Sequence, residues 1–160
     1  PPAFPVTLGL FSGEFGFHEL ADATFDIGQV RVTSRLVPHI GPTLGYRLEC
    51  GGSSIAYISD HQQPYDGSLD VPAAVMELAE GVDLLIHDSQ YTPAEFEKKY
   101  YFGHCTSEFA VGVAMKSRAG RLALFHHDPV RTDDELDSAV RCATAGLEVF
   151  AAREGLVVQV

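Results

Sequence analysis

The sequence has few cysteines, no long apolar run and no leader-like segment, and each shortage excludes a class of protein. No apolar stretch approaches the roughly 20 residues that a membrane-spanning helix needs. Cys50, Cys105 and Cys142 are widely spaced and form no CxxC pair, which favours a reducing compartment over a disulfide scaffold. Residues 1–5 lack the basic and apolar regions of a signal peptide. We therefore expect a cytoplasmic protein that makes no contact with a membrane.

Basic residues are also scarce, and this restricts the partners of the protein. The 11 Lys and Arg residues stand against 22 Asp and Glu residues, which gives a formal net charge of −11. An extended nucleic-acid interface needs a basic stripe, so this balance argues mildly against tRNA as a substrate. A small phosphodiester or another small anionic substrate remains compatible, because a bound dication dominates its local field. The 160 residues, 46% of them hydrophobic, predict one domain spanning 1–160 with a buried core.

Strand patterns come first along the chain, and helices alternate with strands after them. Strands are predicted at residues 6–10, 29–36, 43–49, 53–58, 84–86, 121–125 and 156–160. Helices are predicted over residues 71–78, from Thr92, from Thr106 to about Ser117, and from Thr132 to near Gly155. Asp70 with Pro72 is the predicted start of the first helix, and Gly51-Gly52 is a predicted hairpin turn.

This order of elements predicts an α/β (α+β layered) fold with helices packed on a sheet. The N-terminal half contains too few predicted helices to cover both faces of its own sheet. An exposed half-sheet of this kind promotes self-association, so a homo-oligomer is compatible with the sequence.

Three polar residues, Asp60, His104 and His126, each follow an apolar run or stand in the turn before a helix. Polar residues at the ends of strands are held at a sheet rim, where a rigid backbone can direct them into one cleft. Each has a simpler interpretation taken alone: Asp60 as a turn residue, His104 as the neighbour of an N-cap, His126 as a core or surface histidine. Carboxylate oxygen and imidazole nitrogen together form a ligand set that suits Zn²⁺ and related ions.

The chain resembles the metallo-β-lactamase-fold hydrolases, most closely their ribonuclease Z-like phosphodiesterase branch. The resemblance covers residues 30–137 and rests on five segments: His39-Ile40-Gly41-Pro42, Tyr57-Ile58-Ser59-Asp60, Leu84-Leu85-Ile86-His87-Asp88, Gly103-His104-Cys105-Thr106 and Leu124-Phe125-His126-His127. Each segment is weakly diagnostic, but their order and spacing together are specific. The resemblance implies an αββα sandwich with a two-metal site at the edge between two sheets.

The resemblance also implies a role for each candidate residue. His39, Asp60 and His126 match metal ligands, with Asp60 as the bridge between two ions, and His104 matches the general acid. Zinc is the default metal, and manganese or iron are alternatives. Asp88 is expected to support the site without binding metal directly. His126 is preferred to His127 as the ligand because it follows the strand directly, and alternation puts the two on opposite faces.

Two departures from the family pattern affect these expectations. Tyr57 stands where the ribonuclease Z branch has a glutamate that orients the acid histidine. The signature His-x-His-x-Asp-His, which supplies four metal ligands in the family, is absent from the chain. His39, Asp60 and His126 alone give each metal two protein ligands, fewer than a stable zinc site has.

We therefore expect the chain to be the C-terminal part of a metallo-β-lactamase-like domain, in keeping with a first residue other than Met. The predicted function is a metal-dependent hydrolase, with attack on a phosphodiester by a metal-bound hydroxide, inactive as this chain alone and completed by an N-terminal half or another polypeptide. Two alternatives remain open: a lactam, ester or thioester hydrolase, and a metal-free, non-catalytic interaction or assembly domain of the same fold.

Overall fold

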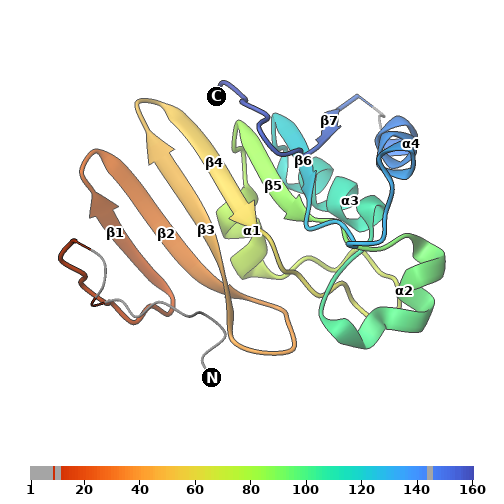
Figure 1. The fold of residues 1–160 in the computed structure, drawn as a ribbon, viewed down its shortest axis with the longest axis horizontal. Coiled ribbons are helices and arrows are strands. Elements are labelled where there is room, and N and C mark those ends of the chain that lie inside the picture. The colour runs from red at the N-terminus through yellow and green to blue at the C-terminus, as the bar shows by residue number, and fades with distance from the viewer. Residues whose placement is uncertain (1–8, 10–11, 144–145) are drawn as a thin grey trace.

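The computed structural model describes residues 9, 12–143 and 146–160, which build one seven-stranded sheet with helices packed against it (Figure 1). The strands are β1 (Ala23–Ile27), β2 (Val30–Val37), β3 (Thr43–Cys50), β4 (Ser53–Ile58), β5 (Leu84–Asp88), β6 (Arg121–Phe125) and β7 (Glu148–Ala151). The helices are α1 (Ala73–Ala79), α2 (Pro93–Lys99), the 3-10 turn η2 (Tyr100–Phe102), α3 (Ser107–Ser117) and α4 (Asp133–Ala143). The predicted mixed α/β fold is confirmed.

The strand pairing changes from antiparallel to parallel at β4. Strands β1 to β4 pair antiparallel with their neighbours, whereas β4, β5, β6 and β7 pair parallel. The β3–β4 connection is the predicted hairpin, in which Gly51 and Gly52 both take positive φ angles of 59° and 90°. Parallel neighbours need crossover connections, and α1, α3 and α4 lie in the three crossovers.

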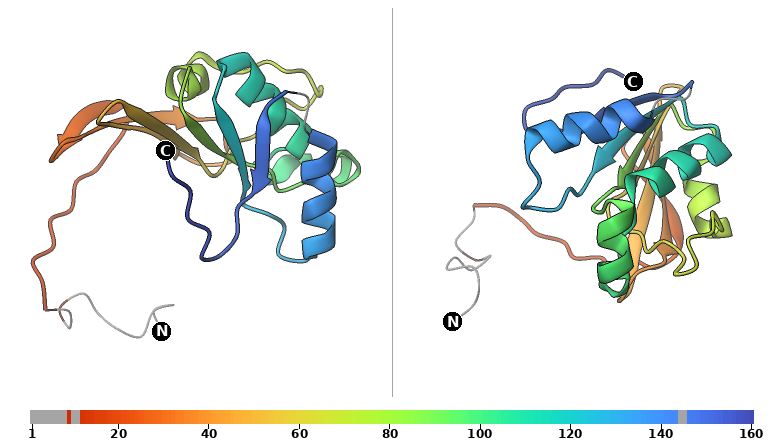
Figure 2. Two further views of the ribbon diagram at one scale, coloured as in Figure 1. Left: turned by 90° about the horizontal axis from the view of Figure 1, so that it is seen from above. Right: turned by 90° about the vertical axis from the view of Figure 1, so that its right-hand side faces the viewer.

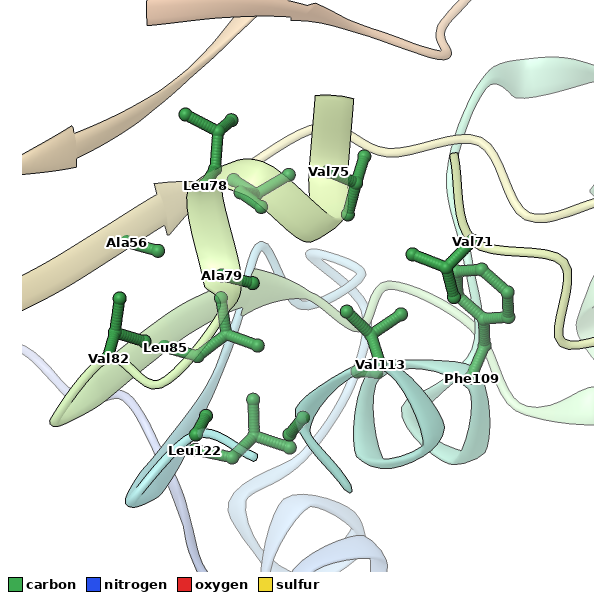
Figure 3. Packing of buried hydrophobic residues seen from close by; sticks show 14 of the residues in the cluster. Ala56, Val71, Val75, Leu78, Ala79, Val82, Leu85, Phe109, Val113 and Leu122 are labelled. Atoms are coloured by element: carbon green, nitrogen blue, oxygen red, sulfur yellow. The ribbon is translucent and has the colours of Figure 1, made fainter. Parts of the chain in front are cut away.

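Helices α1 and α3 pack on the same face of the sheet (Figure 2). Helix α1 contacts β2, β3 and β4, while α3 contacts β5 and β6. The buried apolar core lies between these helices and the strands (Figure 3); it includes Ala56, Val71, Val75, Leu78, Ala79, Val82, Leu85, Phe109, Val113 and Leu122. Alternating positions such as Ala56 and Ile58 on β4 explain why this face is apolar.

The helix starts follow the predicted signals in three cases of four, and α4 begins at Asp133, directly after the predicted Thr132. Thr92 caps α2 in a complete capping box with Glu95, and Thr106 caps α3 by accepting the amide of Phe109. The prediction for α1 was wrong: Pro72 occupies the N-cap position and no side chain, including that of Asp70, caps the helix. The tight packing of Val75 and Leu78, both fully buried, stabilises α1 in place of a cap.

The predictions for the last part of the chain were also wrong. Helix α4 ends at Ala143, and residues predicted to continue it form β7, where Val149 pairs with Leu122 and Phe150 with Ala123. Pairing with β6 buries Val149, so tertiary contacts override the helical pattern. Residues 156–160, predicted as a strand, form none, and Val157 is 91% exposed.

At the other end, β1 was missed, although Ala23, Phe25 and Ile27 alternate with Thr24 and Asp26 as strand residues do. The strand predicted at residues 6–10 lies, except for Gly9, outside the described residues. Within the described part of the chain, no helix is long and apolar enough to cross a membrane.

Candidate metal centre

The parallel strands β4, β5 and β6 end at the same edge of the sheet. Ile58 pairs with His87, and Asp88 with Phe125, so the residues that follow each strand emerge side by side. Asp60 lies two residues beyond β4, and His126 lies immediately beyond β6. His104 precedes α3, and His39 comes from the loop between β2 and β3.

The structure brings the four predicted residues together. His39, Asp60 and His104 each offer a ligand atom, and these atoms all lie within 4.8 Å of one another. The Nε2 atom of His126 lies 3.5 Å from Asp60 Oδ1, and the ring centroid of His126 is 4.8 Å from that of His104. The His39 and His104 ring centroids are 5.2 Å apart. All four side chains therefore belong to one cluster.

A backbone carbonyl orients His39. Its Nδ1 atom lies 2.7 Å from the carbonyl oxygen of Gly103, so Nδ1 carries the proton and Nε2 keeps a lone pair for a metal ion. Gly103 has a φ of 94°, and a Cβ atom there would collide with the His39 ring. Only glycine satisfies both conditions. Gly103 therefore positions His39 as well as the adjacent His104.

A buried carboxylate orients His104. Asp88 is fully buried, and its Oδ2 atom lies 2.8 Å from His104 Nδ1. The same oxygen accepts the backbone amide of His61 at 3.0 Å, and Oδ1 accepts that of Gln90 at 3.0 Å. These bonds fix the carboxylate, and the carboxylate fixes the His104 ring with Nε2 as its available nitrogen. Asp88 thus supplies the orienting carboxylate that Tyr57 cannot provide.

Asp60 and His126 are held by the backbone at the strand ends. The hydroxyl of Ser59 donates to Asp60 Oδ2 at 2.6 Å, which leaves Oδ1 facing His126. His126 has a φ of 57°, a left-handed conformation that is uncommon for residues other than glycine. Backbone conformations of this kind cluster at functional sites, where the surrounding fold enforces them.

His127 lies on the other side of the strand end. It lines a cavity of about 630 Å³ between α3 and α4, together with Arg131 and Leu136. Burial lowers the pKa of His127, with Arg131 as a further cause. The preference for His126 over His127 therefore agrees with the geometry, since only His126 faces Asp60.

A second histidine layer, which sequence reasoning missed, lies beneath the centre. His61 and His87 are both fully buried, and His61 Nδ1 lies 2.9 Å from His87 Nε2. His87 Nδ1 donates to the Asp88 carbonyl, which makes His87 Nε2 the acceptor and His61 Nδ1 the donor. Burial lowers the pKa of both histidines, so both are neutral near pH 7.

Cys105 belongs to the same layer and is not a reactive thiol. Its Sγ donates to the Asp88 carbonyl at 3.0 Å, and burial raises the pKa of this thiol well above its ordinary value. The three side chains His61, His87 and Cys105 all pack against the backbone or side chain of Asp88, or against one another. This layer fixes Asp88 in place.

The donor atoms fit a divalent metal ion of the zinc type. Imidazole nitrogens from His39 and His126 and a carboxylate from Asp60 are the preferred ligand types, and the Gly103 carbonyl and the Ser59 hydroxyl hold His39 and Asp60. His104 Nε2 is a further available nitrogen, and with His39 and Asp60 it forms a group that could hold one metal ion. Four such residues are few for two ions.

Comparison with known proteins identifies the fold family. The model of the beta-lactamase superfamily domain matches residues 13–127. The chain belongs to this superfamily. Its ribonuclease Z resemblance is also supported: ribonuclease Z of Parasynechococcus marenigrum is 41% identical over 73 residues, which are 41% of this chain and 23% of that enzyme. Ribonuclease Z of Sulfurisphaera tokodaii is 35% identical over 88 residues, 55% of this chain and 29% of that enzyme.

Solved structures of the superfamily share the arrangement of this chain. The metallo-beta-lactamase fold protein YhfI of Bacillus subtilis aligns with a TM-score of 0.72 at 21% identity, covering 89% of this chain and 54% of that protein. The short form of human tRNase Z aligns with a TM-score of 0.62 at 25% identity, covering 84% of this chain and 45% of that chain. A diphosphatase of the PhnP family aligns with a TM-score of 0.66 at 22% identity, covering 89% of this chain and 48% of that chain. The chain thus spans about half the length of these superfamily structures, and its matched segments span about a quarter of the curated relatives.

Proposed function

We propose that this chain carries part of the active site of a metal-dependent phosphodiesterase. The observation that supports the proposal is the pairing of His104 with buried Asp88, where His104 lies in one cluster with His39, Asp60 and His126. A histidine oriented by a carboxylate next to a metal-ligand cluster suits an acid that protonates a leaving group. The matched curated relatives are ribonuclease Z enzymes, so we favour phosphodiesters over the other chemistries of the fold.

In this proposal His39, Asp60 and His126 hold the metal, with Asp60 as the bridge if two ions bind. The metal, when bound, lowers the pKa of a water molecule and neutralises charge on the substrate. Zinc suits these donors best, with manganese or iron as alternatives. His104 donates a proton from Nε2 to the leaving oxygen, while Asp88 keeps the Nδ1 side of the ring fixed.

The donor count suggests that further ligands lie outside these 160 residues. His39, Asp60 and His126 give three protein ligands, and zinc sites have three or four for each ion. We therefore propose that an additional His-x-His-x-Asp-His segment, in the same protein or a partner, completes the centre. The chain by itself would then bind metal weakly and hydrolyse phosphodiesters slowly.

The test uses the full-length gene product, loaded with Zn²⁺ or Mn²⁺. Metal content is measured by mass spectrometry, and hydrolysis is followed with bis(4-nitrophenyl) phosphate and with a dialkyl phosphodiester, whose alkoxide is a poorer leaving group. Asp60→Ala should lose metal and activity together. His104→Ala should keep its metal and lose about 100-fold or more in kcat on the alkyl diester, with a smaller loss on the nitrophenyl ester, because nitrophenolate leaves without a proton.

His18→Ala, on an exposed residue remote from the centre, serves as the control. Loss of metal in His104→Ala would make His104 a ligand and would contradict its role as the acid. A folded full-length protein that binds no metal would contradict the hydrolase and favour a non-catalytic domain of the same fold.

A further inference from the structure

Four exposed aromatic side chains form a continuous row beside the candidate centre. Tyr65, Tyr100, Tyr101 and Phe102, called the aromatic row below, are exposed by 68%, 44%, 56% and 47%. Neighbouring ring centroids lie 5.3 Å apart for Tyr65 and Tyr100, 5.5 Å for Tyr100 and Tyr101, and 4.6 Å for Tyr101 and Phe102. The first two pairs meet edge to face, at interplanar angles of 74° and 90°, and Tyr101 and Phe102 are tilted by 32°. The rings thus contact one another while each keeps much of its surface exposed.

One end of the aromatic row reaches the candidate centre. Phe102 directly precedes Gly103, whose carbonyl binds His39 at 2.7 Å, and Gly103 directly precedes His104. Ile40, which is 67% exposed, lies against Gly103 and continues the apolar surface beside His39. The other end reaches a cavity of about 710 Å³, which Tyr65 and Tyr100 line together with Phe96.

The backbone that carries the aromatic row is fixed at both ends. The capping box of α2 precedes it, and the left-handed Gly103 with its bond to His39 follows it. The rings of Tyr100, Tyr101 and Phe102 are therefore held on η2, whereas Tyr65 comes from the segment between β4 and α1 and contacts Tyr100. Ligand sites commonly combine exposed apolar rings with a few polar groups. The apolar surface binds the ligand, and the polar groups orient it.

We propose that the aromatic row binds a planar aromatic group of the substrate, such as a nucleobase or an aryl ring, while the phosphodiester reaches His39, Asp60 and His104. The position of the phosphodiester rests on the proposed function; the binding of the ring does not. Stacking on neutral rings uses the face of a base and needs no basic side chains. The net charge of −11 favours a small ester over a long nucleic acid as the molecule that brings this ring.

The test measures ring binding without metal or phosphate. The full chain, labelled at its aromatic side chains, is titrated with adenosine and with ribose and observed by NMR. Adenosine should shift the signals of Tyr101 and Phe102, and ribose should not. The double variant Tyr101→Ser, Phe102→Ser should weaken adenosine binding about 5- to 100-fold, the range expected for loss of a stacked base.

Phe17→Ser, which removes an aromatic ring that is 76% exposed elsewhere, should leave adenosine binding unchanged. Equal binding of adenosine and ribose, or unchanged adenosine affinity in the double variant, would overturn the proposal while leaving the metal-dependent hydrolysis intact. If sedimentation shows that the double variant only converts a dimer to a monomer, the aromatic row is a self-association surface and the proposal is wrong. Failure of phosphodiester hydrolysis with retained adenosine binding would instead reject the proposed function alone.

Discussion

At the scale of single residues, the candidate centre depends on which ring nitrogen each histidine leaves available. His39 and His104 both use Nδ1 for a protein contact, the first to the Gly103 carbonyl and the second to the Asp88 carboxylate. Both rings therefore present Nε2 to the candidate centre. In His39 this nitrogen offers a lone pair, and in His104 it can carry a proton. The different partners, carbonyl and carboxylate, give two histidines of the same cluster different chemical tasks.

Replacing Asp88 by Asn should weaken the action of His104 as an acid without removing the metal. We expect Asp88→Asn to lower kcat on an alkyl phosphodiester about 10- to 100-fold with unchanged metal content, because the amide no longer holds His104 as the carboxylate does. The free energy of unfolding should fall by about 1–3 kcal/mol. The asparagine side chain has one oxygen, so either the His61 amide, now bound to Oδ2, or the Gln90 amide, now bound to Oδ1, loses its acceptor. Kinetics, metal analysis and urea unfolding measure the three effects.

Asp83→Asn is the matched control. Asp83 also accepts a hydrogen bond from a backbone amide, that of Ser54, and it directly precedes the first residue of β5, at the end away from Asp88. It should leave kcat unchanged. An acid limb of the pH–rate profile that is identical in Asp88→Asn and the unmodified protein would show that Asp88 does not act through His104.

Replacing Gly103 by Ala should damage the centre as well as the fold. The positive φ alone costs about 1 kcal/mol for alanine, and the new Cβ also displaces His39. We expect Gly103→Ala to lose both stability and metal affinity. Gly81→Ala, with a φ of 62° and open space around the new Cβ, should lose stability alone. Thermal unfolding and metal titration of the two variants test this, and equal metal affinities would contradict the role of Gly103.

At the scale of elements, the segment between β5 and α3 determines where His104 and the aromatic row lie. Helix α2 is only seven residues long, too short to be stable by itself, so its start depends on the capping box of Thr92 and Glu95. Arg131 binds Glu95 and the Gln90 carbonyl, which ties the same helix start to the loop after β6. The element is therefore held at its N-terminus by local and long-range contacts together.

Thr92→Ala should loosen this element. We expect the free energy of unfolding to fall by about 1 kcal/mol, because the amide of Glu95 loses its acceptor and the Glu95 carboxylate loses the Thr92 hydroxyl. Thr92→Ser keeps the hydroxyl and should retain most of the stability. Urea unfolding compares the two variants, and equal losses in both would show that the methyl group of Thr92, and not the cap, is the stabilising part.

At the scale of the whole molecule, the buried histidine layer makes stability depend on pH. His61 and His87 have pKa values lowered first by burial, so the folded state keeps them neutral where the unfolded chain, with a pKa of about 6.5, takes up protons. Their contribution to stability is therefore fully present above about pH 6.5 and is lost as the pH falls below that value.

We expect the free energy of unfolding of the metal-free chain to fall between pH 6.5 and pH 5 by up to about 2.7 kcal/mol per pH unit, two protons at about 1.36 kcal/mol each. Urea unfolding at pH 8, 7, 6 and 5.5 measures the slope. His18→Gln should leave the slope unchanged, because His18 is exposed. A flat curve from pH 7 to pH 5.5 would mean that the buried pair is already protonated in the folded state.

The sequence predicted those parts of the molecule that depend on local signals. Apolar patterns and glycine turns located β2 to β6, and the Thr92, Thr106 and Thr132 patterns located three helix starts. The short strand β7 was missed because pairing with β6, and not its own composition, makes it a strand, whereas β1 was missed despite its alternating sequence. Contacts between distant residues were beyond the sequence: Asp88 and His104 are 16 residues apart, and His61 and His87 are 26 apart.

Asp60, His104 and His126 were identified by their positions in the sequence, and the family resemblance added His39 and the role of each residue. Their convergence follows from strand ends that share one sheet edge. Gly103 and Asp88 show what that resemblance could not supply, namely the partner of each ring nitrogen. Such partners depend on the packing of three separate segments against one another.

The order of the strands across the sheet has a consequence for synthesis of the chain. Every strand from β1 to β7 lies beside its neighbours in sequence, so the sheet can grow one strand at a time in the order in which the ribosome releases them. Antiparallel β1 to β4 close through short hairpins and need no later residue, which makes them the natural first folding unit. Each later crossover adds one parallel strand at the growing edge, and His126 joins the other candidate residues only when β6 has paired with β5.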